Sequence, residues 1–253
     1  MGKLLFLGTG TSTGVPEIGC QCRVCRSQDK RDQRSRASAL LSVGGSRILL
    51  DCGPDFRAQV LDLPFEPLDA VLLTHEHYDH VGGLDDLRLF GRLADVNIYA
   101  EKHLCDTIYK RMPYCFGENK YPGSPNIIVN ELHVHESVDI AGQNVLPLRV
   151  MHGKMEITGY RVGDMAYLTD VSNLPDEEYL YLKGLKLLVV SALRQKPHPS
   201  HQCLAEAVAM ASKISAERTY FTHMSHDVGL HEEVESTLPS TMHLAYDGLE
   251  LEW

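Results

Sequence analysis

The hydrophobic positions in the first part of the chain fall into short runs separated by glycine, proline or polar clusters. Runs of this length, rich in leucine, valine and isoleucine, are typical of buried β-strands. Strands are predicted at residues 3–7, 37–43, 47–51 and 69–74. Gly44-Gly45 separates the second run from the third, and we expect a hairpin turn there.

The spacing changes after residue 80. Residues 82–93 and 101–111 carry apolar positions at helical intervals, and a strand is predicted between them at 96–100. The segment 112–125 is rich in proline, glycine and aromatic residues, so we expect a loop there.

Strands dominate the rest of the chain, with helices between some of them. Strands are predicted at 145–150, 157–162, 166–169, 185–191 and 218–222, and helices at 176–182, 200–214 and 231–238. This order predicts two β-sheets packed face to face with helices outside, in a single domain that spans residues 1–253.

The strongest polar pattern follows the apolar run at 69–74. It reads His75-Glu76-His77-Tyr78-Asp79-His80, and Gly82-Gly83 comes after it. In an extended chain His75 and His77 point to the same side, and a following helical turn can bring Asp79 and His80 back to the same space. Four ligands within six residues suit two cations about 3.5–4 Å apart that share a hydroxide. A solvated polar loop would not need three histidines at this spacing.

Four ligands cannot saturate two cations, so other residues must complete such a site. His152, Asp170 and His223 each stand at the end of an apolar run. Strand ends are the places where a rigid sheet presents side chains to a common cleft. We therefore expect these three residues to join the motif.

The composition and the apolar runs indicate which classes of binding partner to expect. Lys and Arg number 24 against 34 Asp and Glu, for a formal net charge of −10, which argues against a nucleic acid partner. The first apolar run is too short for a signal peptide, and none approaches the roughly 20 residues that cross a bilayer. We expect a cytoplasmic protein without a membrane partner, and a homodimer.

The cysteines suggest a second metal site. Three of the seven, Cys20, Cys22 and Cys25, lie within six positions, a crowding that favours metal binding over disulfides. Structural zinc takes four ligands in a tetrahedron. His226 follows His223 by three residues and can close a site of three cysteines and one histidine, with the zinc-binding loop at 19–26. The competing interpretation is three free thiols in a flexible loop.

The H-x-H-x-D-H element and the three later residues resemble the metallo-β-lactamase superfamily, from Gly8-Thr9-Gly10 to the C-terminus. The resemblance implies an α/β fold, a four-layer αββα sandwich. It implies that His75, His77 and His152 bind one metal, that Asp79, His80 and His223 bind the other, and that Asp170 bridges both. Asp51 matches the early aspartate of the family, which supports the metal loop without being a ligand.

The N-terminal cysteines and Gly14-Val15-Pro16 are similar to the PhnP branch, the cyclic ribose phosphate phosphodiesterases of the carbon–phosphorus lyase pathway. The resemblance places His201, at the start of the predicted 200–214 helix, against the phosphate, where it assists the leaving group. His198 lies nearby but is not expected to take this role. His201 and Asp79 are thus the expected catalytic residues.

The implied reaction is hydrolysis of a small phosphodiester, such as a cyclic ribose phosphate, by a hydroxide that two Mn²⁺ or Zn²⁺ ions activate, beside one structural Zn²⁺. Three alternatives stay open. An RNA-processing nuclease would need a long Gly/Pro/Lys-rich arm, which the sequence lacks. A thioesterase or lactonase could use the same metals. A non-enzymatic relative of the pyrroloquinoline quinone biosynthesis factor would have an incomplete set of ligands.

Overall fold

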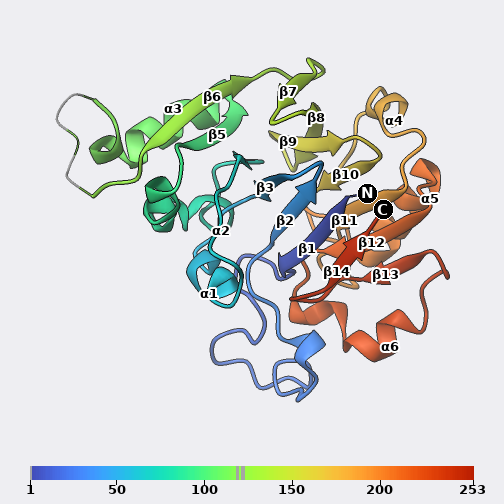
Figure 1. Cartoon of the computed structure of the whole chain (residues 1–253). Helices are drawn as coiled ribbons and strands as arrows, with labels where there is room; N and C mark the ends of the chain where they lie inside the picture. The colour runs from blue at the N-terminus through green and yellow to red at the C-terminus, as the bar shows by residue number, and fades with distance from the viewer. Residues whose placement is uncertain (1, 118–119, 121–122) are drawn as a thin grey trace.

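Two mixed β-sheets form the centre of the molecule (Figure 1). The computed structural model describes residues 2–117, 120 and 123–253. Within them, the first sheet has the order β14-β1-β2-β3-β4-β5-β6 and the second the order β13-β12-β11-β10-β9-β8-β7.

The strands of the first sheet are β1 (Lys3–Gly8), β2 (Ser38–Val43), β3 (Ser46–Leu50), β4 (Ala70–Leu72), β5 (Val96–Glu101), β6 (Ile127–Leu132) and β14 (Glu250–Glu252). Those of the second are β7 (Val138–Ile140), β8 (Gln143–His152), β9 (Met155–Val162), β10 (Met165–Leu168), β11 (Leu187–Ser191), β12 (Arg218–Thr222) and β13 (Met242–Leu244). The α-helices are α1 (Phe56–Val60), α2 (Tyr78–Val81), α3 (Lys102–Arg111), α4 (Glu178–Tyr181), α5 (Leu204–Ile214) and α6 (His231–Glu235). Among the described residues no helix is both long and apolar enough to cross a membrane.

Three buried clusters separate four layers. Alternate residues of β1 show the division, because Leu4 and Phe6 belong to the cluster between the two sheets whereas Leu7 faces the opposite way. The other two clusters join the first sheet to α1 and α3, and the second sheet to α4 and α5. The predicted four-layer αββα sandwich is confirmed.

The carboxyl ends of several strands meet at one edge of the sandwich. β3, β4, β5 and β6 are parallel neighbours in the first sheet, and β10, β11, β12 and β13 are parallel neighbours in the second. β1 runs in the same direction as β3, because both pair antiparallel with β2. The segment after β1 reaches this edge, where Gly10 bridges to Met224, the residue that follows His223.

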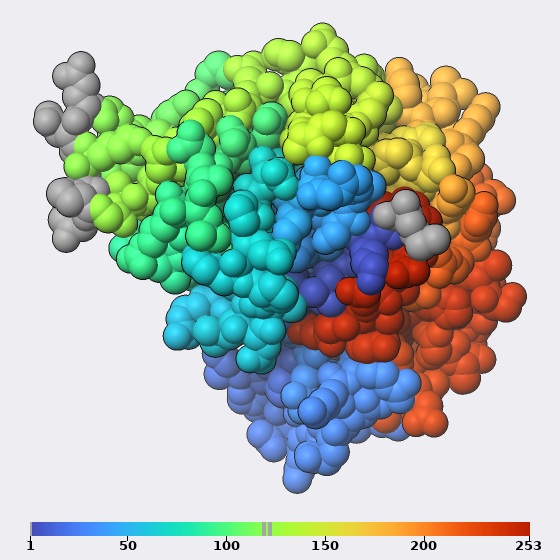
Figure 2. Space-filling model, viewed as in Figure 1, coloured from blue at the N-terminus to red at the C-terminus, as the bar shows by residue number. Residues whose placement is uncertain are grey.

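The two ends of the described chain meet at the opposite edge. Gly2 N donates to Trp253 O at 3.2 Å, and Trp253 N donates back to Gly2 O at 3.1 Å. Figure 1 shows both ends side by side. The long connection between β1 and β2 leaves the sandwich as a separate lobe below the sheets, and a second lobe carries α3 (Figure 2).

Two predicted helices differ from the structure. The helix expected at 82–93 is replaced by two 3₁₀ turns, Leu84–Arg88 and Phe90–Arg92. Gly83 explains the interruption. A Cβ there would lie 2.1 Å from the carbonyl oxygen of Gly53, so the backbone at Gly83 packs directly against the backbone of Gly53, and the chain turns at this contact. The helix expected at 200–214 begins only at Leu204. Gln202 N donates to Val171 O at 2.7 Å and holds the preceding residues outside the helix.

The remaining differences concern short elements at the periphery. Strands β6, β7, β13 and β14 and helix α1 have no counterpart in the predicted pattern. The loop predicted at 112–125 includes residues 118–119 and 121–122, which lie outside the described residues; a 3₁₀ turn, Pro113–Cys115, forms in its described part.

Candidate metal centre

The H-x-H-x-D-H segment leaves the sandwich at the end of β4. His75 is fully buried, and His77 is the N-cap of α2, with extended backbone angles. Asp79 and His80 then lie in the first turn of this short helix. Gly53 lets the turn approach closely, because a Cβ there would stand 2.1 Å from the carbonyl oxygen of Asp79. The extended stretch and the helical turn thus direct all four side chains inward, as the spacing predicted.

Asp51 anchors this segment from the end of β3. Its carboxylate accepts from Thr74 N at 2.9 Å and from Thr74 Oγ1 at 3.0 Å. Its Oδ2 lies 2.7 Å from His80 Nδ1. A histidine held at Nδ1 by a carboxylate presents Nε2 to a metal with a fixed ring orientation. The geometry matches the supporting role expected for Asp51.

Three residues at this edge adopt a left-handed backbone that side chains rarely take. Asp51, Asp170 and His223 have φ values of 57°, 53° and 56°. Such a conformation costs about 1–3 kcal/mol per residue, and it clusters at functional sites. At the end of each strand it turns the side chain back over the edge of the sheet, toward the metal loop.

The first group of candidate ligands consists of His75, His77 and His152. His75 Nε2 lies 3.0 Å from His77 Nδ1, and one nitrogen of His152 lies within 4.8 Å of both. His152 Nδ1 is 2.8 Å from the carbonyl oxygen of Ser200. That contact uses Nδ1, so Nε2 is the nitrogen of His152 that is available to bind a metal together with His75 and His77.

The second group consists of Asp79, His80 and His223, with Asp170 beside them. Oδ2 of Asp79 and Oδ2 of Asp170 each lie 3.2 Å from His80 Nε2 and 3.3 Å from His223 Nε2. His80 Nε2 is buried and has no hydrogen-bond partner among the described residues. Ligand atoms about 2.1 Å from one cation stand about 3.4 Å apart in a tetrahedron, so these four atoms fit a shared divalent cation.

Asp170 links the two groups. Its carboxylate lies within 4.8 Å of His75 and His80, and also of His152 and His201. Thr169 Oγ1 donates to Oδ2 at 2.7 Å and orients it. Each of the seven residues predicted from the sequence lies in this cluster. Asp170 thus lies between the two groups, and its bridging role stays a prediction.

Charge and burial favour the metal-binding forms of His75 and Asp170, whereas they favour the protonated form of His80. Burial lowers the pKa of His75 well below its usual value, so the ring is neutral. Burial opposes ionisation of Asp170, yet His223 and His80 hold the pKa of this carboxyl well below its usual range. Burial also works against a proton on His80, but Asp51 and Asp170 raise its pKa well above the usual value. A cation at Nε2 would therefore displace a proton.

His201 lies beside the cluster, as predicted, although it precedes α5 instead of opening it. Its Nδ1 is 3.7 Å from Asp170 Oδ1, and its ring centre is 4.6 Å from that of His152. Burial lowers the pKa of His201 to about 3. The ring is neutral near pH 7 and can donate a hydrogen bond without carrying a charge. His198 is farther out, with its ring centre 5.2 Å from that of His201.

The N-terminal loop forms a second candidate metal site. Ligand atoms of Cys20, Cys22, Cys25 and His226 all lie within 4.8 Å of one another. Cys25 Sγ is 3.5 Å from His226 Nδ1 and accepts from Glu17 N at 3.3 Å. Three sulfurs and one ring nitrogen are a donor set of structural zinc.

Several supporting contacts have weak signals in the sequence. Thr74 and Thr169 each precede a candidate ligand directly, a position that could have suggested their role. Tyr160 OH donates to the carbonyl oxygen of Leu73 at 2.5 Å, and Ser200 supplies its carbonyl to His152. Only the folded chain reveals these two, because each joins segments that are far apart in the sequence.

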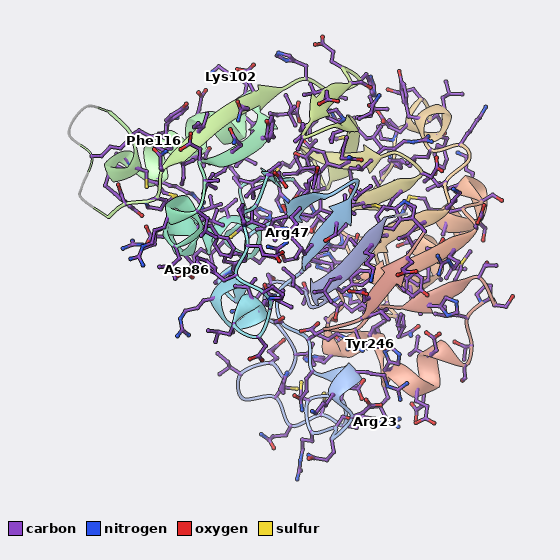
Figure 3. The ribbon with its side chains drawn as sticks, viewed as in Figure 1. Arg23, Arg47, Asp86, Lys102, Phe116 and Tyr246 are labelled. Atoms are coloured by element: carbon purple, nitrogen blue, oxygen red, sulfur yellow. The ribbon has the colours of Figure 1, made fainter. Side chains whose placement is uncertain are left out.

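An apolar cavity of about 370 Å³ lies away from both clusters. It is bounded by the outer side of the first sheet and by α1, and Arg47 and Asp86, labelled in Figure 3, are among its described lining residues. Those lining residues include none of the clustered histidines or of their aspartate partners. The chemistry is assigned to the metal cluster.

Residues 46–224 match the family model of the beta-lactamase superfamily domain. The chain belongs to this superfamily. The resemblance drawn from the sequence is confirmed, and with the clustered His and Asp side chains it supports a metal-dependent hydrolase.

Known proteins differ in how much of their sequence and length they share with the chain. A structure described as a new diphosphatase from the PhnP family is 42% identical, with a TM-score of 0.93, and the match covers 100% of this chain and 97% of that one. An octanoyltransferase of Porphyromonas gingivalis is 47% identical over 98% of this chain, but the match covers only 51% of that protein. The chain thus spans about half the length of this relative. Zn²⁺-bound PqqB from Methylobacterium extorquens, at 21% identity and a TM-score of 0.79 over 99% of this chain and 100% of that one, shares the fold alone.

Proposed function

We propose that this superfamily member hydrolyses a small phosphodiester, such as a cyclic ribose phosphate. The observation that carries the proposal is the pair of ligand groups joined by Asp170, with His201 beside them. Two divalent cations held there would lower the pKa of a shared water and neutralise the phosphoryl oxygens. His75, His77 and His152 would hold one cation, and Asp79, His80 and His223 the other.

The protein's own side chains orient the substrate and the leaving group. Asp170 lies between the two ligand groups and contacts His80, and Asp51 fixes the orientation of the His80 ring. Neutral His201 donates a hydrogen bond to the oxygen that leaves phosphorus, where negative charge develops. We also propose that a structural zinc ion occupies the cluster of Cys20, Cys22, Cys25 and His226.

A second candidate substrate class is the diphosphate linkage. The structure with 42% identity that matches the whole chain is described as a diphosphatase. A phosphorus that carries both an ester and a P–O–P linkage is doubly substituted, as in a diester, so the same side chains would act on it. The acyl transfer named for the Porphyromonas protein is not carried over, because that protein is about twice as long as this chain.

A substrate panel tests the proposal. Protein loaded with Mn²⁺ or Zn²⁺ is assayed on cyclic ribose phosphates, cyclic nucleotides, nucleoside diphosphate esters and thioesters. We expect turnover of diesters or diphosphates that a chelator abolishes and added metal restores. Asp170→Ala should lower this turnover by several orders of magnitude, because it removes the carboxylate expected to bind both cations and leaves their mutual repulsion less compensated.

The outcomes separate the competing classes. Thioester hydrolysis without phosphodiester turnover would replace the proposal by the thioesterase alternative. Near-normal activity of Asp170→Ala, with its metal content unchanged, would show that Asp170 does not bridge. Absence of turnover on every substrate of the panel, even for protein loaded with metal, would favour a non-enzymatic member of the fold.

A further inference from the structure

A recess lies between the metal loop and the lobe that carries α3. It has a volume of about 170 Å³, and its walls include Tyr78, Leu84, Ile108, Arg111, Met112 and Tyr114. Complete sites for drug-sized ligands measure roughly 300–1,000 Å³, so a space of this size suits one ring of a larger ligand. The mechanism described above uses none of these side chains.

One wall of the recess belongs to the same segment that carries four of the candidate ligands. Tyr78 stands between the candidate ligands His77 and Asp79, and it is 64% exposed although Asp79 is buried. Thr107 Oγ1 donates to Glu76 Oε2 at 2.9 Å and ties α3 to the metal loop. Tyr78 and the recess thus border the segment that carries four of the candidate ligands.

The rings that flank the recess are held in place. A Cβ at Gly82 would lie 2.8 Å from Cε2 and 2.9 Å from Cζ of Tyr78, so the ring lies directly over this glycine. Tyr114 OH donates to Asp85 Oδ1 at 2.8 Å. Ile108 and Met112 are buried behind the rings and supply an apolar floor. In Figure 3 the labels of Asp86 and Phe116 mark the two segments, the 84–88 turn and the end of the 113–115 turn, that border this region.

We propose that the recess binds a planar, single-ring group on the organic arm of the phosphate substrate, such as a pyrimidine base. Tyr78 stacks on this ring, and Arg111 at the rim offers hydrogen-bond donors to its polar edge. Aromatic stacking accepts any planar base, whereas an alkyl or bare sugar arm leaves the recess unused. This inference rests on the proposed function and assigns its substrate class.

The experiment compares two cyclic phosphodiesters that differ only in the base. Uridine 2′,3′-cyclic phosphate carries the ring, and methyl riboside 2′,3′-cyclic phosphate lacks it. We expect the unsubstituted protein to prefer the uridine substrate in kcat/KM. Tyr78→Ala should reduce that preference about tenfold, mainly through KM, which is within the range for loss of one stacked aromatic partner. Tyr78→Phe should keep most of the preference, because it keeps the ring.

Tyr109→Ala is the matched control. Tyr109 is a comparably exposed tyrosine at 44%, and it packs on Phe116 outside the recess. The inference is overturned if Tyr78→Ala and Tyr109→Ala change the preference equally, or if Tyr78→Ala leaves it unchanged. Metal content is measured in each variant, so that loss of the cluster is not mistaken for loss of stacking. Failure of the proposed function gives a different result, because the unsubstituted protein would then hydrolyse neither substrate.

Discussion

At the scale of single residues, the centre depends on side chains held at the ends of strands by unfavourable backbone angles. Asp51, Asp170 and His223 all have positive φ, and a glycine at any of them would relieve strain but remove a functional group. The sequence could identify these residues because each follows an apolar run. It could not show their backbone conformation, which the packing of the two sheets imposes.

His201 gives the sharpest prediction at this scale. Its N–H should assist a poor leaving group more than a good one, since only the poor one needs its developing charge stabilised. His201→Ala should lower hydrolysis of an alkyl or sugar phosphodiester about 10²-fold more than that of a nitrophenyl diester. Steady-state rates on both substrates measure the difference.

His198→Ala is the control for this comparison, because His198 lies on the same segment and its ring centre is 5.2 Å from that of His201. It should leave the ratio of the two rates near that of the unsubstituted protein. Equal losses on both substrates in His201→Ala would indicate a role in binding instead of leaving-group assistance.

At the scale of elements, the sequence predicts those whose pattern is local. The strand that ends with His152, and the strands that end before His75, Asp170 and His223, were found because each is a short apolar run. The prediction of a helix at 82–93 was wrong because the backbone at Gly83 packs against that of Gly53. No local pattern in the sequence encodes this contact. The three-residue strands β7 and β13 are too short to show a period.

The N-terminal loop is the element with the clearest test. We expect three metal ions per chain, two exchangeable at the catalytic cluster and one tightly held by Cys20, Cys22, Cys25 and His226. Cys22→Ser should remove one equivalent and make the loop more sensitive to trypsin, because Arg23, Arg26 and Lys30 lie in or next to it. Elemental analysis and timed proteolysis measure both effects.

Ile18→Ala serves as the control in the same loop, since Ile18 is 98% exposed and is not a candidate ligand. It should keep all metal equivalents and the original cleavage rate. A reproducible content near one ion per chain in the unsubstituted protein, after metal supplementation, would contradict the two-cation centre.

At the scale of the whole molecule, both sheets share one buried layer, to which β1 and β14 contribute Leu4, Phe6 and Leu251. We infer that the chain unfolds as one unit. Trp253, the single tryptophan, packs against this layer and should report its loss. Tryptophan fluorescence and far-ultraviolet circular dichroism should therefore show the same midpoint on heating.

Metal should raise this midpoint, because a ligand that binds only the folded state stabilises it by mass action. Chelation should lower the midpoint for both signals together. Two separate transitions, one for each signal, would instead show that the sandwich consists of independently folding parts.

The meeting of Gly2 and Trp253 has a consequence for the order of the motifs. Their paired backbones lie at the edge opposite the metal cluster, so a short linker could close the chain into a ring without approaching the site. Opening that ring at the turn between β9 and β10, which contains Gly163, would give a circular permutant. In such a chain Asp170 and His223 would precede the H-x-H-x-D-H segment, while every ligand kept its place in space. The chemistry therefore depends on which strands end at this edge, and not on the linear order of the motifs.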